Sequence, residues 1–380
     1  MKRIFSLALV ILIAFNSIIY AENFDEEVNG VLLGEFDTGE ILYQKNINKK
    51  FNIASITKLM TYIITMEAIE DGLADYEDVV VIGENPPKEW GSTFYLEEGD
   101  MLPLKTLLDS IMIASANDSC VAIAEYIAGS EENFVKLMNK KARELNLNNT
   151  KYINSNGLPE ANDNQNIMTI KEIYKLSRYV IKRYPEILDI TDKRSIQIKW
   201  RKYKPNTNPL LIDMPWVDGL KTGYTDSAGY CLVSTINIPK GETNDKDMRF
   251  IGVLMGAESE PKRKIKSMEL LNYGINNYKY KRIISDNKGI TVNIKNAKNM
   301  EVKAISKEEI NILVKNEDVI KTKILLKEGV DAPIKKNEYI GKLQIYKNDI
   351  KNKEVALYSS RDIKKANIFV RLFRIIFNKG

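Results

Sequence analysis

The sequence predicts an α+β protein in which helices pack on a mainly antiparallel sheet, followed by a small all-β domain and an amphipathic C-terminal helix. Three observations support this fold class. Residues 24–276 have β-rich segments at both ends and helical periodicity between them, short β-rich runs fill residues 280–360, and residues 361–380 carry apolar and basic side chains at helical spacing. The chain has 380 residues, of which 44% are hydrophobic and 28% charged, so it can hold more than one domain.

The first 21 residues have the layout of a secretory signal peptide. Lys2 and Arg3 precede a long apolar run, and Ala21 supplies a small residue before the acidic segment "ENFDEE". The length of the apolar run also permits an uncleaved signal anchor. In both cases we expect the bulk of the chain to be exported.

Residues 24–276 are expected to form the first domain. They begin with "VLLGEFDTGEILYQ", in which two apolar runs flank a turn at residues 37–39, a pattern typical of a β-hairpin. Apolar residues then recur at helical spacing from Ile56 to Ile63, in "LPLKTLLDSIMI" and in "SEENFVKLMNKKARELNL". The domain closes with two β-rich runs, "GYCLVSTINI" and "RFIGVLMGA". Outer strands around a helical middle indicate helices packed on a mainly antiparallel sheet.

Residues 280–360 are expected to form a small all-β domain. Asn, Lys, Gly and Asp separate the short runs "ITVNI", "EVKAI", "INILV", "KILL", "IGKLQIY" and "EVALYS", which is typical of strands joined by turns. This region contains no recognisable catalytic constellation.

Residues 361–380 are predicted to form an amphipathic helix on a membrane surface. On a helical wheel the polar residues share one narrow arc and the apolar residues fill most of the rest; the polar set is Lys364, Asn367, Arg371, Arg374 and Asn378, and the apolar set is Ala366, Phe369, Val370, Leu372, Phe373, Ile376 and Phe377. Because Arg371 and Arg374 lie within it, the apolar run is shorter than the roughly 20 residues that span a bilayer. A helix docked on the protein itself is the alternative.

The charge distribution and the cysteine count exclude some classes of protein. Of the net charge of +5, Lys2 and Arg3 contribute two units and residues 361–380 contribute five, which leaves −2 for residues 22–360. The body therefore offers no basic surface for nucleic acid. Cys120 and Cys231 are too few for a disulfide framework in an exported protein, and two buried free thiols are favoured over a bridge.

The chain contains no histidine. A Ser-His-Asp triad, a Cys-His dyad and any zinc site that uses histidine are therefore excluded. If the protein has a nucleophile, another side chain must activate it, and lysine is the main remaining candidate.

Ser55 and Lys58, in "NIASITKLMT", are candidates for a nucleophile and its base. If a helix begins near Ser55, the two residues lie one turn apart on the same face, where their side chains can touch. Burial and the positive end of the helix dipole both disfavour the ammonium form of Lys58, so its amine can take the proton of Ser55. Free backbone N–H groups at a helix start can also face a developing oxyanion. Taken alone, this SxxK spacing also fits an ordinary N-cap beside a solvated lysine.

Two further stretches favour the catalytic interpretation. "IASANDS" supplies Ser115 and Asn117 in a short break between two helical patterns, and "VDGLKTGYTDSAGYCLV" supplies residues 221–223, Lys-Thr-Gly, at the start of a strand. Each alone is compatible with a helix cap or a turn. Their order matches the SxxK, SxN and KTG pattern of serine penicillin-recognising enzymes.

With these motifs in place, the chain resembles the low-molecular-mass penicillin-binding proteins that act as serine-type D-alanyl-D-alanine carboxypeptidases. The blocks "FNIASITKLMT", "LEEGDMLPLKTLLDSIMIASANDSCVAIAEYIAGS", "NNTKYINSNGL" and "VDGLKTGYTDSAGYCLV" are similar to blocks of that family in the same order. The resemblance covers nearly the whole mature chain. It implies a transpeptidase/β-lactamase-like catalytic fold and a position on the outer face of the bacterial cytoplasmic membrane.

The resemblance also implies roles for the motif residues. Ser55 would attack the carbonyl between the two terminal D-alanines of a peptidoglycan stem peptide, with Lys58 as general base, and form an acyl-enzyme. Ser115 would relay a proton to the leaving amine, helped by the positive field of Lys221, and Asn117 would orient the backbone amide of the substrate. β-Lactam antibiotics would be covalent inhibitors. Water releases the product, so the resemblance implies no metal or organic cofactor.

The substrate is expected to lie along the KTG segment. Thr222 would donate a hydrogen bond to the terminal carboxylate, Gly223 and Tyr224 would also bind the substrate, and by resemblance the backbone N–H groups of Ser55 and Tyr224 would form the oxyanion hole. Counting back from "LLNYG", the resemblance implies that Arg263 binds the terminal carboxylate, although a solvated basic turn is equally compatible with "EPKRKIK".

The sequence departs from the family at two positions. Many relatives have a histidine where this chain has Tyr224. An arginine often found in the loop that reads "NTNPLL" here is absent, with Thr207 near its place. The second departure puts the geometry of that loop in question more than the chemistry.

Two alternatives remain from the sequence. A class A β-lactamase shares SxxK and KTG, but it carries SDN where this chain has Ala116, and its water-activating glutamate would have to be Glu160, four residues before Asn164. A catalytically silent wall-binding protein of the same fold is the other alternative. It would have no need for Lys58, Ser115 and Lys221 together.

Overall fold

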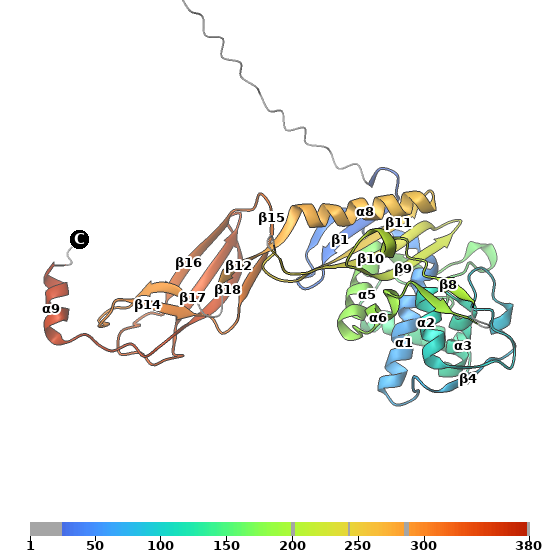
Figure 1. Ribbon diagram of the computed structural model, residues 1–380, viewed down its shortest axis with the longest axis horizontal. Helices are drawn as coiled ribbons and strands as arrows, with labels where there is room; N and C mark the ends of the chain where they lie inside the picture. Colours follow the sequence, from blue (N-terminus) through green and yellow to red (C-terminus); the bar gives the residue numbers. More distant parts are fainter. Residues whose placement is uncertain (1–24, 199–201, 242–243, 285–288, 378–380) are drawn as a thin grey trace, which may run out of the picture.

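The computed structural model describes residues 25–198, 202–241, 244–284 and 289–377. Figure 1 shows two parts placed end to end along the long axis: a part with mixed helices and strands, and a β-rich part that leads to the C-terminal helix. The predicted signal peptide, residues 1–21, lies outside the described residues.

A five-stranded antiparallel sheet forms the centre of the first part, in the order β2-β1-β11-β10-β9. Its strands are β1 (Gly30–Glu35), β2 (Ile41–Lys45), β9 (Val217–Thr225), β10 (Gly229–Ile238) and β11 (Met248–Ala257). β1 and β2 form the predicted hairpin, and the two β-rich runs predicted at the end of the domain are β10 and β11. Because β1 also pairs with β11, the start and the end of this domain meet inside one sheet.

Alternate side chains of the central strands enter two separate cores. Leu32 and Val253 pack in the core that the sheet shares with most of the helices, whereas Val31 and Leu33 pack in a second core with Leu270 of α8 (Glu260–Asn277). α8 therefore covers one face of the sheet, and most of the other helices of the first part cover the opposite face (Figure 1).

The helices on that opposite face surround α1 (Lys58–Glu70). Residues 58–66 of α1 are all buried, as expected for a helix with neighbours on every side. Its neighbours are α2 (Leu104–Ile113), α3 (Asn117–Ala128), α4 (Glu131–Glu144) and α5 (Ile170–Arg183), and α6 (Ile187–Thr191) packs on α2 and β9. The helices predicted in "LPLKTLLDSIMI" and "SEENFVKLMNKKARELNL" are α2 and α4. The helix predicted to begin near Ser55 begins with a 3-10 turn, η2 (Ala54–Thr57), and becomes α-helical at Lys58.

Short elements complete the first part. They are the strand pairs β3 (Lys50–Asn52) with β6 (Ile167–Thr169), β4 (Val79–Val81) with β5 (Met101–Pro103) and β7 (Ser195–Gln197) with β8 (Tyr203–Pro205), the 3-10 turns η3 (Pro86–Lys88) and η4 (Ala161–Asp163), and the helix α7 (Leu210–Asp213). β3 leads directly into η2, so its pairing with β6 fixes the chain just before Ser55.

The second part is built from strands, as predicted. β13 (Ile290–Asn293), β14 (Glu301–Ile305), β16 (Ile320–Leu326), β17 (Tyr339–Lys347) and β18 (Ile350–Ser359) form a sheet in the order β13-β14-β18-β17-β16, and β12 (Tyr278–Ile284) pairs with β15 (Ile310–Lys315). Each of the six predicted runs lies in one of the strands β13 to β18. The C-terminal helix α9 (Ile368–Phe377) follows them.

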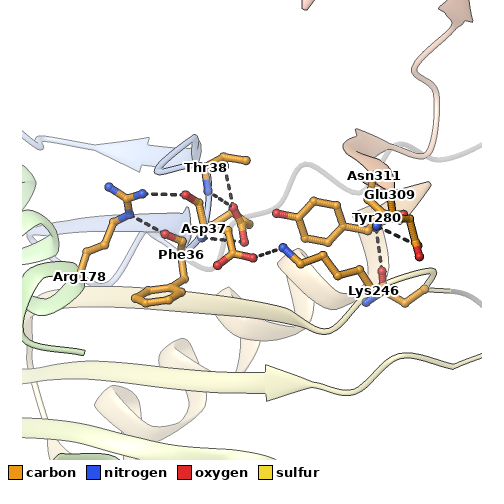
Figure 2. A network of polar contacts seen from close by, with 10 residues as sticks. Phe36, Asp37, Thr38, Arg178, Lys246, Tyr280, Glu309 and Asn311 are labelled. Carbon is orange, nitrogen blue, oxygen red and sulfur yellow. Dashed lines mark hydrogen bonds and ion pairs between the residues drawn. The ribbon is translucent and has the colours of Figure 1, made fainter. Parts of the chain in front are cut away.

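Polar contacts around the β1–β2 turn lie where the first strand of the second part meets the first part (Figure 2). Lys246, between β10 and β11, forms an ion pair with Asp37 in the β1–β2 turn and lies 4.9 Å from the ring centroid of Tyr280 in β12. Arg178 of α5 donates hydrogen bonds to the carbonyl oxygens of Phe36 and Asp37 on the other side of that turn. Tyr280 also packs in the core under α8. The predicted boundary between residues 276 and 280 falls where α8 ends and β12 begins, and it stays a proposal because β12 shares that core.

The two cysteines are buried and unpaired, which confirms the prediction of free thiols. Burial raises the pKa of both the Cys120 and the Cys231 thiol to about 12. Neither is therefore a reactive thiolate near neutral pH.

Candidate active site

Ser55 lies in η2, between β3 and α1, and its side chain is half-buried at the edge of a cleft. The preceding residue, Ala54, has a φ of 46°, in the left-handed region that residues with a Cβ rarely adopt. The backbone therefore bends sharply just before the serine. Backbone strain of this kind clusters at functional sites, where the surrounding structure holds it in place.

Lys58, the first residue of α1, is fully buried, and its amine has three oxygen neighbours. Nζ lies 2.8 Å from Oγ of Ser55, 2.7 Å from Oδ1 of Asn117 and 2.8 Å from the carbonyl oxygen of Asn156. The contact that the sequence predicts between Ser55 and Lys58 is thus present in the structure.

The surroundings of Lys58 favour a neutral amine. Burial lowers the pKa of Lys58, although the carboxylates of Glu89 and Asp118 act in the opposite direction. The Asn117 and Asn156 oxygens can only accept hydrogen bonds, so they take both protons of a neutral amine and leave its lone pair toward Ser55. In that state the Ser55 hydroxyl donates to Nζ, which is the arrangement that a general base requires.

A loop at residues 154–158 completes the surroundings of Lys58. Gly157 has a φ of 91°, and a Cβ at this position would lie 1.9 Å from the carbonyl oxygen of Ala54, so only glycine lets the loop approach the turn of Ser55. Asn156 offers its carbonyl to Lys58, and its side chain donates to Glu89 at 2.9 Å. This partner of Lys58 could not be predicted from the sequence, because every residue has a backbone carbonyl and the residue type does not show which one binds the amine.

Ser115 and Asn117 come from the break between α2 and α3. Asn117 is buried; its Oδ1 accepts from Lys58 and its Nδ2 donates to the carbonyl oxygen of Trp90 at 2.6 Å. The Asn117 oxygen thus positions Lys58, while the Nδ2 group has a second N–H beside the one bonded to Trp90 and lines the cleft, so its role toward a substrate stays a prediction. Ser115 lines the cleft, and its hydroxyl forms no hydrogen bond with another described residue, which leaves it available to a ligand.

Residues 221–224 follow one another on β9, the edge strand of the five-stranded sheet, beside the turn of Ser55. A Cβ at Gly223 would lie 3.1 Å from the carbonyl oxygen of Ile53 and 3.3 Å from the backbone nitrogen of Ser55. The glycine therefore allows the strand and the turn to come close together. This approach brings the Ser55 N–H beside β9, as an oxyanion hole shared with the Tyr224 N–H requires.

Lys221 and Thr222 differ in their access to the cleft. Lys221 is buried behind the described cleft-lining residues and donates to the carbonyl oxygen of Thr222 at 3.0 Å. Burial lowers the pKa of Lys221 well below its ordinary value, and the charge of Lys58 lowers it further. Thr222 lines the cleft and its Oγ1 donates to Oγ1 of Thr207 at 2.6 Å. Thr207, near the place of the arginine found in many relatives, is therefore in direct contact with the KTG segment.

The cleft has a volume of about 800 Å³ and gathers most of the predicted site residues. Lys58 and Lys221 lie behind its wall, and seven predicted residues line it: Ser55, Ser115, Asn117, Thr222, Gly223, Tyr224 and Arg263. The Tyr224 ring is exposed and stacks on Tyr230, with 4.2 Å between the ring centroids. Residues from both ends of the first part thus meet in one site.

Arg263 lies in the first turn of α8, at one side of the cleft. Its Nη2 forms an ion pair with Oε1 of Glu260 at 2.7 Å, and its guanidinium lies 5.7 Å from the ring centroid of Tyr230. Lys262 and Lys264, its neighbours in "EPKRKIK", form ion pairs with residues that do not line the cleft. Arg263 is therefore the cation of this turn that reaches the cleft. Its partner, Glu260, is not among the residues predicted from the sequence.

The two residues that would favour a class A β-lactamase lie outside the described lining of the cleft. Glu160 and Asn164, the residues that a class A β-lactamase would need, are exposed and bonded to each other through their backbones at 2.8 Å. Neither belongs to the described lining of the cleft. In the described part of the chain, no three cysteine, aspartate or glutamate side chains gather where they could hold a metal ion.

Comparisons with known proteins match both parts of the chain. The model of the peptidase S11 family, described as D-alanyl-D-alanine carboxypeptidase, matches residues 20–259. The chain belongs to this family. A model of the C-terminal domain of penicillin-binding protein 5 matches residues 278–365. Membership in the D-alanyl-D-alanine carboxypeptidase family confirms the predicted family and the prediction of a serine peptidase.

Individual members of the D-alanyl-D-alanine carboxypeptidase family are similar over most of the chain. D-alanyl-D-alanine carboxypeptidase DacF of Bacillus subtilis is 34% identical over 359 residues, which cover 92% of this chain and 89% of DacF. The crystal structure of a peptidoglycan synthesis regulatory factor, PBP3, from Streptococcus pneumoniae superposes with a TM-score of 0.71 at 25% identity, covering 89% of this chain and 99% of PBP3. These matches confirm the predicted penicillin-binding fold with its C-terminal β domain.

One structural neighbour contains a β-lactam. Penicillin-binding protein D2 of Listeria monocytogenes, in its ampicillin-bound form, superposes with a TM-score of 0.59 at 26% identity. The match covers 66% of this chain and 97% of that protein. A fold of this kind is therefore able to hold a β-lactam.

Proposed function

We propose that the chain is a serine-type D-alanyl-D-alanine carboxypeptidase that removes the terminal D-alanine from pentapeptide stems of peptidoglycan. The observation that carries this proposal is the contact between Lys58 and Ser55, 2.8 Å from Nζ to Oγ, at the edge of a cleft that also holds Ser115 and Thr222. A buried amine of lowered pKa beside a partly accessible hydroxyl is the arrangement of an activated nucleophile.

Acylation would proceed from the neutral amine of Lys58. The amine takes the proton of Ser55 as Oγ attacks the carbonyl carbon between the two D-alanines, and the oxyanion forms at the backbone N–H groups of Ser55 and Tyr224. The C–N bond then breaks, and the proton that Lys58 took passes through the Ser115 hydroxyl to the leaving amine of D-alanine, so Lys58 is neutral again and Ser115 keeps its hydroxyl. Water subsequently hydrolyses the ester on Ser55. The chain contributes the side chains of Ser55, Lys58 and Ser115 and the two backbone N–H groups to these steps.

The carboxylate end of the substrate would lie between Thr222 and Arg263. Both residues line the cleft, and Arg263 supplies a guanidinium that stays charged despite its burial. Lys221, behind the cleft wall, would contribute to the field at this end when its amine is protonated. Gly223 and Tyr224 would border the backbone of the peptide along β9.

β-Lactam antibiotics would acylate the same serine. Support comes from the similarity to the ampicillin-bound protein of Listeria monocytogenes and from the cleft that gives access to Ser55. A carboxypeptidase of this kind would stay acylated for long periods, whereas a β-lactamase would release the hydrolysed drug rapidly. The exposed positions of Glu160 and Asn164 favour the carboxypeptidase.

The protein would act outside the cell, attached to the outer face of the cytoplasmic membrane by α9. The apolar side chains of α9 point away from the protein, since at least half of the surface is exposed at Ile368, Phe369, Leu372, Phe373, Ile376 and Phe377. Arg374 faces the other way and donates to the carbonyl oxygen of Ala297 at 2.7 Å. None of the described helices is long and apolar enough to cross a bilayer. An apolar face turned outward suits a helix that lies in the membrane interface.

Mass spectrometry after incubation with a pentapeptide that ends in D-Ala-D-Ala tests the proposal. We expect the peptide to lose one alanine residue and the protein to carry a transient acyl group. An intact peptide after prolonged incubation would favour the catalytically silent alternative. Rapid turnover of penicillin, with slow peptide cleavage, would favour the β-lactamase.

A further inference from the structure

The cleft contains more negative than positive side chains. Among the described residues that line it, the carboxylates are Asp163, Asp226 and Glu260, and the cation is Arg263. Glu260 already pairs with this cation. A ligand that carries a free carboxylate therefore meets an arginine whose charge is balanced by the protein.

Arg263 is held firmly, whereas Glu260 is not. The Arg263 side chain is 5% exposed and packs beside the ring of Tyr230, but its partner Glu260 is 63% exposed. Glu260 reaches Arg263 with one oxygen, from the preceding turn of the same helix. It can therefore swing into solvent without disturbing the arginine.

The guanidinium also has unused capacity for hydrogen bonds. Nε of Arg263 is buried and has no partner among the described residues, and the hydrogen bond to Glu260 involves Nη2 alone. Arginine binds a carboxylate best with two parallel N–H groups. A ligand carboxylate that makes two such bonds would thus bind more strongly than the single bond it replaces.

We propose that Glu260 is a specificity-determining residue that occupies the carboxylate subsite on Arg263 and competes with the free C-terminus of the substrate. This inference rests on the proposed function, because it takes the terminal carboxylate of the peptide as the ligand of Arg263. Substrate binding displaces Glu260 from the guanidinium, and the ion pair re-forms when the product leaves. Competition from Glu260 weakens the binding of free-acid peptides and does not change the binding of amidated peptides.

The substitution Glu260→Gln tests the proposal, since it keeps the size of the side chain and removes its charge. For a peptide ending in free D-Ala-D-Ala, KM should fall about two- to fivefold, the scale of an exposed ion pair, with kcat unchanged. The amidated peptide should show no change. Glu258→Gln is the matched control, because Glu258 forms a similar ion pair with Lys262 but does not line the described cleft. It should leave both peptides unaffected.

Binding to a Ser55→Ala background separates this inference from the proposed function. By calorimetry, adding Glu260→Gln to that background should tighten binding of the free-acid peptide by about two- to fivefold, and adding Arg263→Ala as well should abolish the gain. Unchanged or weaker affinity after Glu260→Gln, or an equal change for the amidated peptide, would overturn the inference. If the wild-type chain released no D-alanine at all, the proposed function would fail instead.

Discussion

The amine of Lys58 lies 2.8 Å from the hydroxyl oxygen of Ser55, and groups from distant parts of the chain hold it there. Asn117 and Asn156 each offer an oxygen to the amine. The nucleophile and its base are therefore oriented before a substrate arrives. Changes at either residue should act on the acylation step itself.

Replacing Ser55 should remove the site of acylation. Benzylpenicillin should add its mass to the wild-type protein, and peptide mapping should locate the adduct on "NIASITK". The Ser55→Ala variant should carry no adduct because it lacks the attacking oxygen. Ser360→Ala, in the second part of the chain, should be acylated like the wild type. Full retention of the adduct by Ser55→Ala would refute the assignment of the nucleophile.

Replacing Lys58 with arginine should slow acylation by roughly a hundredfold or more, the usual scale for a lost general base. Arginine keeps the positive charge but does not give a neutral form near pH 7. Lys221→Arg should have a milder effect, because Lys221 is expected to supply charge and no proton transfer. Time courses of the penicillin adduct measure both rates, and circular dichroism melts identify variants that fail to fold. Near-normal acylation of folded Lys58→Arg would exclude Lys58 as the base.

The pH dependence of acylation should follow the charge of Lys58. Burial lowers its pKa below the ordinary 10.5, whereas the Glu89 carboxylate raises it. As the pH falls through this lowered pKa, the amine gains a proton and acylation slows. The folded state loses stability at higher pH, as the pH falls from the ordinary 10.5 to the lowered pKa, because in that range the unfolded chain binds the proton and the folded protein does not. Glu89→Gln removes a raising influence, so the acid limb of the profile should move to lower pH.

The glutamine in this variant can still accept the hydrogen bond from the Asn156 side chain, so the loop next to Lys58 keeps its contact. Glu84→Gln serves as the control, since Glu84 is an exposed residue paired with Lys88. Its acid limb should coincide with that of the wild type. If the acid limb of the pH profile of Glu89→Gln stayed at the wild-type pH or moved to higher pH, the proposed influence of this carboxylate on the pKa of Lys58 would be contradicted.

Structural features that depend on residues close together in the sequence could be predicted. Ser55 and Lys58 are three residues apart, so the start of a helix is enough to bring them together. The hairpin of β1 and β2 and the strands of the second part follow from apolar runs separated by turn residues. The three motifs identify the site because their residue types and their order are specific. The distances between them along the sequence do not predict how the three segments are arranged in the folded protein.

Features that depend on side-chain conformation or backbone groups could not be predicted. The carbonyl of Asn156 binds Lys58 whatever its side chain, and Asn117 turns both of its polar groups toward the protein. The ion pair between Glu260 and Arg263 spans three residues of α8, but only the folded structure shows that it faces the cleft. Likewise, no local pattern indicates that Tyr280 packs into the core of the first part.

Removing the guanidinium of Arg263 should discriminate between substrates. If it binds the terminal carboxylate, Arg263→Ala should reduce kcat/KM for a free-acid peptide far more than for the amidated form. Lys262→Ala, one residue earlier and outside the described cleft lining, should affect both peptides little. Steady-state kinetics on the two peptides measure the difference. Equal losses on both substrates would indicate that Arg263 has a structural role.

Removing residues 361–380 should release the protein from the membrane and leave penicillin binding intact. α9 makes no contribution to the cleft, and its outward apolar side chains, such as Phe369 and Phe373, are exposed in the structure. Insertion of this face into the interface would bury them, whereas its short length prevents spanning. The double substitution of Phe369 and Phe373 by serine should weaken the attachment without shortening the chain. Fractionation followed by penicillin labelling measures both properties. If the truncated protein remained on the membrane after cleavage at Ala21 was verified, the anchor would have to lie elsewhere in the chain.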